Sequence, residues 1–212
     1  MTLIIDESYL LISGVLQTLY VAFWSLLFSL ACGLIIGFLR TLKSKPLLFI
    51  GRLHLEAFRI IPLIVWLFAV FFTLPRMLGF SISGQFTAVF VFTLWGAAEM
   101  GEMVRAALIS LPIIQKESGT ALGLSPMQLF VYILLPQALR RMLPGIINMA
   151  TRLIKTSSMA FLVGVLDLVS RGQQIIERTN EPLIIYTFLF FMFFLLCWPL
   201  SLLSKRLEKR HV

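Results

Sequence analysis

The chain has 212 residues, of which 59% are hydrophobic and only 13% charged, with a net charge of +8 at pH 7. Soluble domains average about 45–50% apolar and about 25% charged residues. This composition excludes an ordinary soluble domain and predicts one all-α domain embedded in a membrane, where basic residues indicate orientation rather than nucleic-acid binding. Cys32 and Cys197 lie inside apolar runs and are expected to be buried thiols.

Five stretches are apolar over the roughly 20 residues that a membrane-spanning helix needs. In chain order they are 14–37, 57–75, 85–106, 143–164 and 183–204. The middle three carry charges, which are expected to face the bundle interior or water. These charges are Arg59, Glu99, Glu102, Arg152 and Lys155.

Three further features are predicted along these stretches. Pro62 is expected to kink the second span, because proline lacks a backbone N–H and clashes within a helix. Glu102 and Arg105 are three residues apart and are expected to form a local ion pair. Segment 165–182 predicts a short amphipathic helix, after which Pro182 is expected to start the last span.

The charges between these stretches predict an orientation. Basic residues gather in segments 40–59 and 105–141 and in the tail 205–210, whereas the N-terminal region carries Asp6 and Glu7 and no basic residue. Since lysine and arginine favour cytoplasmic loops, we expect the N-terminus outside and the C-terminus inside. An odd number of spans, five, agrees with that orientation.

The segment "KESGTALGLSPMQLFVYILLP" (116–136) interrupts the apolar pattern. A helix is expected to end at Gly123, because glycine readily takes the left-handed conformation after a helix. Ser125 is a good N-cap, Pro126 suits the first helical position and Gln128 completes a capping box. Local chemistry therefore predicts two short helices meeting at a fixed angle within a loop at 112–136. An ordinary interhelical loop is the alternative.

The spacing within this segment carries a resemblance. Glu117, Gly123, Ile133, Leu135 and Pro136 follow the pattern E-x5-G-x9-I-x-L-P, which resembles the EAA loop of ABC importer permeases. The family usually has Glu-Ala-Ala where this chain has Glu-Ser-Gly, so the small residues are retained.

The resemblance extends over about residues 14 to 208. "FRIIPLIVWLF" (58–68), "MVRAALISLP" (103–112), "LPQALRRMLPGIIN" (135–148) and "LIKTSSMAFLVGVLDL" (153–168) are similar to segments of polar-amino-acid uptake permeases. The chain is thus identified as a member of the polar amino acid branch of type I ABC importer permeases.

This resemblance implies a permease subunit of the bacterial inner membrane that carries a polar amino acid or a similar small zwitterion. The implied partners are a cytosolic ABC ATPase dimer, a second permease subunit, identical or similar, and a periplasmic or lipid-anchored substrate-binding protein. The residues expected to couple to the ATPase are Glu117, Ser118, Gly119, Ala121, Gly123, Leu124, Ser125, Pro126, Ile133 and Pro136.

The chain has no G-x-x-x-x-G-K-[ST] phosphate-binding motif. ATP and magnesium are therefore expected on the partner ATPase, with no cofactor or metal in this chain, which is not expected to be an enzyme.

A free amino acid presents an ammonium and a carboxylate, so a cavity with both charges suits it. We expect Lys155 and Arg152 to engage the carboxylate and Glu99 the ammonium; the alternative is that Glu99 and Arg152 pair structurally. Ser157 and Ser158 either donate to a carboxylate or bond back to their own helix. Lys155 matches the family, whereas four residues at positions expected to line the cavity depart from it: Glu99, Arg152, Ile61 and Trp66.

Three other functions stay open. A proton-coupled secondary transporter would use Glu99 or Glu102 as its proton site. A membrane-embedded enzyme would need a catalytic or metal cluster, but His54 and His211 are the only histidines and have no Cys, Asp or Glu cluster around them in the sequence. An amino-acid-sensing receptor subunit without transport is the third.

Overall fold

The computed structural model of the chain describes residues 2–40 and 45–211, and all regular structure in that part is helical. Positions 41–44 of the basic segment and the side chain of His211 lie outside what it describes. The α-helices are α1 Thr2–Asp6, α2 Ser8–Leu39, α3 Lys45–Ile60, α4 Leu63–Phe68, α5 Leu74–Leu78, α6 Gly84–Ile109, α7 Ile113–Ala121, α8 Pro126–Gln128, α9 Leu135–Thr156, α10 Leu168–Thr179 and α11 Pro182–His211. Two π-helical turns, η1 Ala69–Thr73 and η2 Leu129–Leu134, and one 3-10 helix, η3 Ser157–Val163, connect them.

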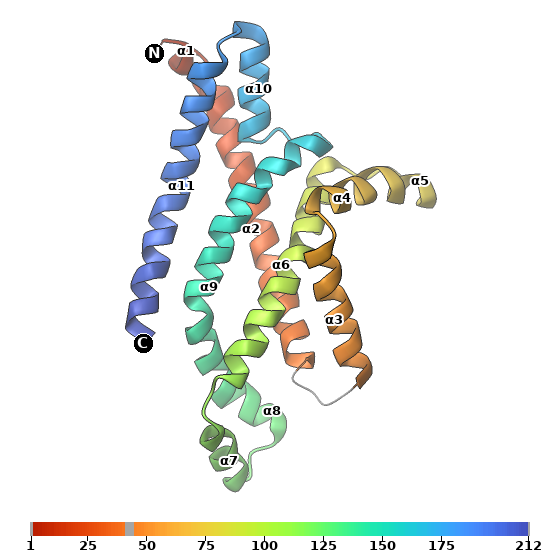
Figure 1. The fold of residues 1–212 in the computed structure, drawn as a ribbon, viewed down its shortest axis with the longest axis vertical. Coiled ribbons are helices and arrows are strands. Elements are labelled where there is room, and N and C mark those ends of the chain that lie inside the picture. Colours follow the sequence, from red (N-terminus) through yellow and green to blue (C-terminus); the bar gives the residue numbers. More distant parts are fainter. Residues whose placement is uncertain (1, 41–44, 212) are drawn as a thin grey trace.

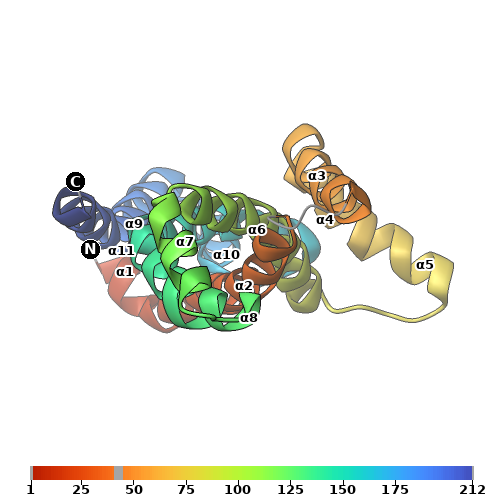
Figure 2. The same ribbon diagram turned by 90° about the horizontal axis from the view of Figure 1, so that it is seen from below.

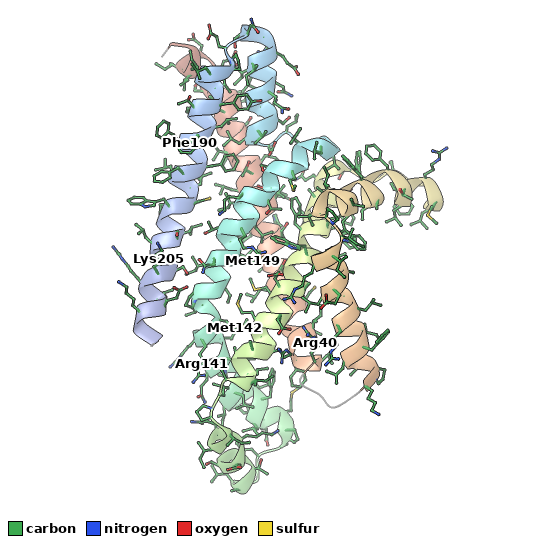
Figure 3. All side chains as sticks on the ribbon, viewed as in Figure 1. Arg40, Arg141, Met142, Met149, Phe190 and Lys205 are labelled. Atoms are coloured by element: carbon green, nitrogen blue, oxygen red, sulfur yellow. The ribbon has the colours of Figure 1, made fainter. Side chains whose placement is uncertain are left out.

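Helices α2, α6 and α9 form the centre of an elongated bundle, with α11 beside α9 and α10 near one end (Figure 1). The main core cluster contains Val21, Phe92, Met100, Met149 and Leu153 from these three helices. Met149 is labelled on α9 in Figure 3. The expected helical core is therefore present.

Helices α2 and α6 approach closely because small residues face each other. A Cβ atom added at Gly33 would lie 2.4 Å from the Cβ of Met100, and one at Gly96 would lie 2.1 Å from the Oγ of Ser29. Glycine at such crossings lets two backbones come together, as is common between membrane helices. These contacts fix α6, and with it Glu99 and Glu102, against α2.

Three helical runs among the described residues are long and apolar enough to cross a membrane: Ser8–Leu39, Pro126–Val163 and Pro182–Lys209. A fourth is added if the bent pair Lys45–Ile60 and Leu63–Leu78 counts as one span. Helix α6, which carries three charged residues, is not in this set. The all-helical membrane fold is confirmed, and the number of five crossings stays a prediction.

The second predicted span, 57–75, is broken rather than kinked. Pro62 has an extended conformation (φ −57°, ψ 139°), and the helices on either side meet at 105°. Proline removes one backbone donor and disfavours helical geometry at Ile61 before it, so the helix ends there. Helices α4 and α5 then project away from the bundle as an arm (Figures 1 and 2).

The helix after the predicted loop differs from expectation in length. The capping residues at 125–128 start one helical run, Pro126–Val163, which contains the whole of the fourth predicted span except residue 164. The prediction of a second short helix was therefore wrong, because no residue between Gln128 and Leu135 stops the helix. The long run connects residues 126–134 directly to the residues around Arg152.

Helix α10 confirms the predicted amphipathic helix. Asp167 caps it by accepting a 2.9 Å hydrogen bond from the Ser170 amide, and Asn180, with φ 56°, ends it. Its apolar face packs on α2 and α11 through Leu168 and Ile175. Asp167 is fully buried, and this burial raises its pKa to about 6.

The predicted start of the last helix at Pro182 is confirmed. Ser204 of α11 donates a 3.0 Å hydrogen bond to the Pro144 carbonyl, which ties α11 to α9. Phe190 and Phe191 are exposed on α11, and Figure 3 shows Phe190 pointing away from the bundle, as a lipid-facing side chain would.

Candidate functional site

One candidate site is the segment from the start of α7 to the end of η2, residues 113–134, which we call the knuckle. It contains the turn between α7 and α8. The Leu124 amide donates to the Gly119 carbonyl at 3.1 Å, and the Gly123 amide donates to Thr120 at 3.0 Å. These two bonds form a Schellman motif around Gly123, whose φ is 77°. The predicted helix end at Gly123 is confirmed.

The capping box after Gly123 is also present. The Ser125 hydroxyl accepts from the Gln128 amide at 3.3 Å, and the Ser125 amide donates to the Gln128 side chain at 2.9 Å. Pro126 occupies the first turn, as predicted. Local hydrogen bonds satisfy the backbone groups at the end of α7 and at the start of α8. These bonds fix the angle between α7 and the following helix.

Packing inside the knuckle depends on Gly119. This residue is buried, and a Cβ atom added there would lie 2.4 Å from the Cδ1 of Leu129, itself 5% exposed. The small residue lets α7 lie directly on η2. The structure thus gives Gly119 a packing role within the chain.

Two side chains brace the knuckle against the bundle, and neither was predicted from the sequence. Arg141 of α9 donates to the carbonyl and the hydroxyl of Ser110, at 2.7 and 2.8 Å, just before α7 begins. Gln137 donates to the Ile133 carbonyl at 3.0 Å and to the Gln115 side chain of α7 at 3.4 Å. Gln137 and Arg141 are four residues apart on one helix, so the sequence alone indicates that they lie on the same face.

The outer face of the knuckle is open. Ile113, Lys116, Glu117, Thr120 and Ala121 line a shallow groove along α7. Glu117, Ser118, Ala121, Ser125 and Pro126 are all exposed, Leu124 and Ile133 are half-buried, and Pro136 is exposed at the start of α9. Across the described ranges, Glu117 forms no ion pair. The groove therefore presents an exposed carboxylate that is not in an ion pair, beside Lys116 and the apolar Ile113 and Ala121.

A second candidate site lies between α6 and α9. Arg152 pairs with Glu99 at 3.0 Å, and its guanidinium lies 4.8 Å from the centre of the Trp95 ring. The Arg152 side chain is 48% exposed and that of Glu99 is 25% exposed, so solvent reaches both. The structure therefore brings these two predicted residues together as an accessible ion pair.

Trp66 lies next to this pair. It packs in one cluster with Trp95 and stacks on Phe58, with ring centres 4.7 Å apart. Its indole nitrogen is buried without a hydrogen-bond partner in the described part of the chain. Ile61, at the break before α4, is 36% exposed.

Lys155 is not part of the pair, although it follows Arg152 by three residues. It is exposed, forms no ion pair with any described residue, and its charge lies close enough to Cys197 of α11 to interact with it. Ser157 and Ser158 bond back to the carbonyls of Ile154 and Lys155, at 2.8 and 2.6 Å. Both hydroxyls are thus occupied by their own helix, the second of the two predicted arrangements.

Glu102 pairs with two arginines. The expected bond to Arg105 is present at 3.2 Å, and Arg40 at the end of α2 reaches the same carboxylate at 2.8 Å. Figure 3 places Arg40 toward the knuckle end of the bundle. Both carboxylates that a proton-coupled transporter would use, Glu99 and Glu102, are therefore held by arginines.

The histidine near the bundle has a structural contact. A ring nitrogen of His54 lies 3.1 Å from the Leu94 carbonyl, which places α3 against α6. Among the residues described, no three His, Cys, Asp or Glu side chains gather as metal ligands would.

Comparison with protein families identifies the chain. Residues 13–211 match the family described as binding-protein-dependent transport system inner membrane component. The chain belongs to this family, whose members are transport components, not enzymes.

Individual proteins agree with the family. The chain is 34% identical over 203 residues to the probable glutamine ABC transporter permease protein GlnP of Bacillus subtilis, covering 93% of this chain and 92% of that protein. It is 31% identical to the L-cystine transport system permease protein TcyL of the same organism, covering 92% and 85%. The crystal structure of an amino acid ABC transporter shares the fold, with a TM-score of 0.88, 24% identity and coverage of 98% and 96%.

Proposed function

We propose that the chain is the permease subunit of an ABC importer that carries a polar amino acid, or a similar small zwitterion, across the bacterial inner membrane. The relatives named for glutamine and L-cystine transport support the substrate class. A separate ATPase hydrolyses ATP. The observation that carries this proposal is the knuckle, because its two helix ends, its packing and its braces make it a stiff element with an exposed face.

The knuckle lies on the cytoplasmic side, with the N-terminus outside and the C-terminus inside. Arg40, Arg141 and Lys205 are labelled toward the knuckle end of the bundle in Figure 3, which supports this orientation. Helix α6 is the additional crossing that makes five. Its 26 residues extend roughly 39 Å at about 1.5 Å per residue, more than the roughly 30 Å hydrocarbon core.

The groove on α7 binds the ATPase. Glu117 contributes a carboxylate for a charge-assisted hydrogen bond, flanked by Ser118, Ala121 and the exposed Ile113. Gly119, Gly123, Leu124, Ser125, Pro126, Ile133 and Pro136 hold the face in place. A stiff knuckle transmits the movement of the ATPase subunits to α6 and α9, which carry Glu99 and Arg152.

The test uses two glycines of matched geometry. Gly123 and Gly79 have φ of 77° and 76°, and at neither would an added Cβ atom meet another group within 4 Å. A β-branched side chain is strained in this conformation by roughly 1–2 kcal/mol. Gly123→Val should insert in the membrane and lose ATP-driven uptake, while Gly79→Val, which imposes the same strain at the end of α5, should retain it. Wild-type uptake by Gly123→Val would overturn the coupling proposal.

The substrate binds at the Glu99–Arg152 pair. In this arrangement the two side chains neutralise each other without substrate, and a zwitterion replaces the pair by giving its ammonium to Glu99 and its carboxylate to Arg152. Lys155 attracts the carboxylate from one turn away, and Trp66 with Trp95 forms an aromatic wall. Ile61, Ser157 and Ser158 adjoin the site without donating to the substrate.

The complete importer contains further subunits. A second permease subunit, identical or similar, completes the pathway, because five helices cannot enclose a gated route. A periplasmic or lipid-anchored binding protein delivers the substrate. The family description supports a binding protein as partner, because it calls the transport binding-protein-dependent. Magnesium and ATP bind to the ATPase, and this chain carries no cofactor.

A further inference from the structure

A separate polar cavity lies at the end of the bundle remote from the knuckle. It has a volume of about 420 Å³ and is formed where α2, α6 and α10 begin. Its polar lining consists of Ser13, Gln17, Ser83, Gln85 and Arg171, and none of the acidic residues that the structure describes lines it. The volume falls in the range of small-molecule sites, roughly 300–1,000 Å³.

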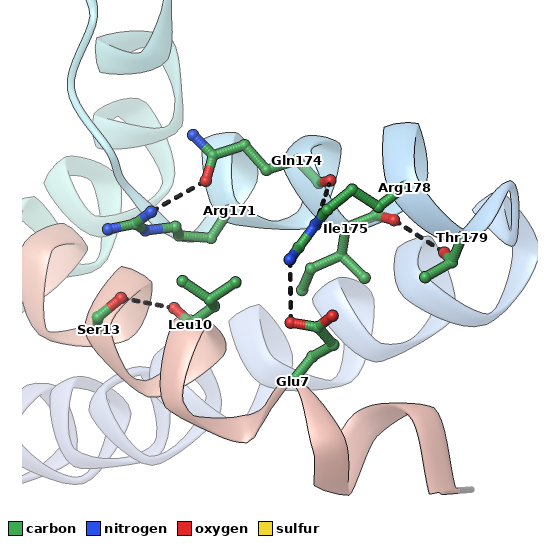
Figure 4. A network of polar contacts seen from close by, with 8 residues as sticks. All are labelled: Glu7, Leu10, Ser13, Arg171, Gln174, Ile175, Arg178 and Thr179. Carbon is green, nitrogen blue, oxygen red and sulfur yellow. Dashed lines mark hydrogen bonds and ion pairs between the residues drawn. The ribbon is translucent and has the colours of Figure 1, made fainter.

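No acidic side chain in the described part of the chain forms an ion pair with Arg171. Its Nη1 donates to the Gln174 side chain at 2.9 Å, while its Nε is shielded from solvent and lacks a partner among the described residues. Arg178, two turns further along the same helix, instead pairs with Glu7 at 3.0 Å. Figure 4 shows both arginines, with Arg171 held by Gln174 and Arg178 directed at Glu7.

The acid one turn earlier in the chain forms no ion pair with Arg171 in the part that the structure describes. Asp167, one turn before Arg171, caps α10 through one carboxylate oxygen, and its other oxygen is buried without a partner. A cation that is partly buried and unpaired is costly, and an anion that reaches it gains a charge-assisted contact. Arg171 is therefore placed to attract an anion into the cavity.

The other walls also favour an anion. The cavity includes the first residues of α6, Gly84 and Gln85, where free backbone amides and the helix dipole favour negative charge. This end of α6 is held firmly, because a Cβ atom added at Gly84 would lie only 1.8 Å from the Val163 carbonyl oxygen. Gln17 and Gln85 add amide groups that bind either a donor or an acceptor.

We propose that this cavity is an entry site, which holds the carboxylate of the amino acid released by the binding protein at Arg171 before the molecule reaches Glu99 and Arg152. The proposal rests on the proposed function and adds a second, outer site to it. A terminal guanidinium nitrogen of Arg171 makes the charge-assisted contact, and Gln17 and Gln85 contact the remaining polar groups.

The experiment measures protection of a thiol placed in the cavity. Ser13→Cys is introduced into the full chain with Cys32 and Cys197 changed to alanine, in lipid nanodiscs, and labelled with an anionic thiol reagent. L-Glutamine should slow the labelling, whereas L-glutaminamide, whose carboxylate is replaced by an amide, should not. In the Arg171→Gln background, half-protection should need at least roughly tenfold more L-glutamine.

Two further variants serve as controls. Arg178→Gln removes a positive charge from the same helix outside the cavity and should leave protection unchanged. Arg171→Lys keeps the charge and should give protection between the wild-type and Arg171→Gln values, which also shows that the end of the bundle remains folded.

Two results would overturn the entry site. These are equal protection by L-glutamine and L-glutaminamide, and equal effects of Arg171→Gln and Arg178→Gln. Each of them leaves the Gly123→Val test of the proposed function unaffected, so failure of the entry site and failure of the importer function are distinguishable.

Discussion

The chain changes direction sharply at Gly123 and at Pro62, and the two bends differ in how they are fixed. At Gly123, a Schellman motif closes one helix and a capping box opens the next. At Pro62, no side chain caps α4, and the arm that follows exposes Val65, Phe72 and Met77. The knuckle is thus stiff by its own chemistry, whereas the direction of the arm depends on what packs against it.

A third turn, at Gly164, is closed by local hydrogen bonds in the same way as the knuckle. Val165 and Gly164 donate to Ala160 and Phe161, at 3.2 and 3.0 Å, in the same Schellman pattern, and Asp167 caps the helix that follows. Both locally closed turns hold a candidate site in place: the knuckle orients the Glu117 groove, and the Gly164 turn orients Arg171. If the hydrogen bonds and packing within each turn make it rigid, substitutions that disturb them should reduce uptake or change stability.

The largest effect is expected from filling the space between α7 and η2. Gly119→Val places a side chain where Leu129 lies, and such overpacking costs about 1–3 kcal/mol. We expect α7 to be displaced and ATP-driven uptake to fall at least tenfold, measured with the assembled importer in vesicles. Adding Leu129→Ala should restore part of the uptake; no recovery in the double variant would contradict this packing account.

The substrate pair should give the next largest effect. Glu99→Gln and Arg152→Gln each remove one charged partner of the zwitterion, and hydrogen bonds to charged groups contribute about 1.5–3 kcal/mol. Substrate affinity of the chain in nanodiscs should fall roughly tenfold or more in each variant. Unchanged affinity and specificity in both would show that the pair is purely structural.

The Gly164 turn gives a prediction on pH. Burial raises the pKa of Asp167 to about 6, from 3.8, so the folded chain binds this proton more tightly than the unfolded chain does. The protonated acid therefore adds to the free energy of unfolding below about pH 4. This contribution is lost as the pH rises from about 4 to about 6, and it is absent above about pH 6. Asp167→Asn keeps the cap and cannot ionise, so it should melt a few degrees above wild type at pH 8 and close to it at pH 4.

The comparison variant for this experiment is Glu181→Gln, at an exposed position between α10 and α11. It should shift the melting temperature little at either pH. A melting difference for Asp167→Asn that is the same at pH 4 and pH 8 would contradict the role given to the buried carboxyl.

The smallest effect is expected at the knuckle cap. Ser125→Ala removes the hydroxyl that accepts from the Gln128 amide and should cost about 1 kcal/mol. Because the Schellman motif and the braces by Gln137 and Arg141 remain, uptake should fall only about two- to threefold. Loss of uptake as complete as in Gly123→Val would mean that the cap alone fixes the angle.

The sequence predicted those parts of the molecule whose determinants are adjacent in the chain. Gly123, the capping residues that follow it and Pro182 act on their immediate neighbours, so their effects follow from residue type. The amphipathic pattern of α10 is equally local. All of these features are present where they were expected.

The remaining features depend on residues that are distant in the chain. Arg40 reaches Glu102, and Arg141 reaches Ser110, only because the helices pack as they do. The sequence predicted that Lys155 and Arg152 engage one substrate carboxylate, whereas in the structure the Lys155 charge lies near Cys197 of another helix. The 105° bend at Pro62 likewise exceeds what a proline alone indicates, since many prolines only kink a helix.

The central claim, that the knuckle face binds a separate ATPase, is tested most directly by photo-crosslinking. A crosslinker is attached at Glu117→Cys, and for comparison at Phe190→Cys on the lipid-facing side of α11, in the chain whose own cysteines are replaced by alanine. In membranes that contain the assembled importer, position 117 should crosslink to the ATPase and position 190 should not. Crosslinking of position 117 only to lipid, or to no other subunit, would contradict the claim.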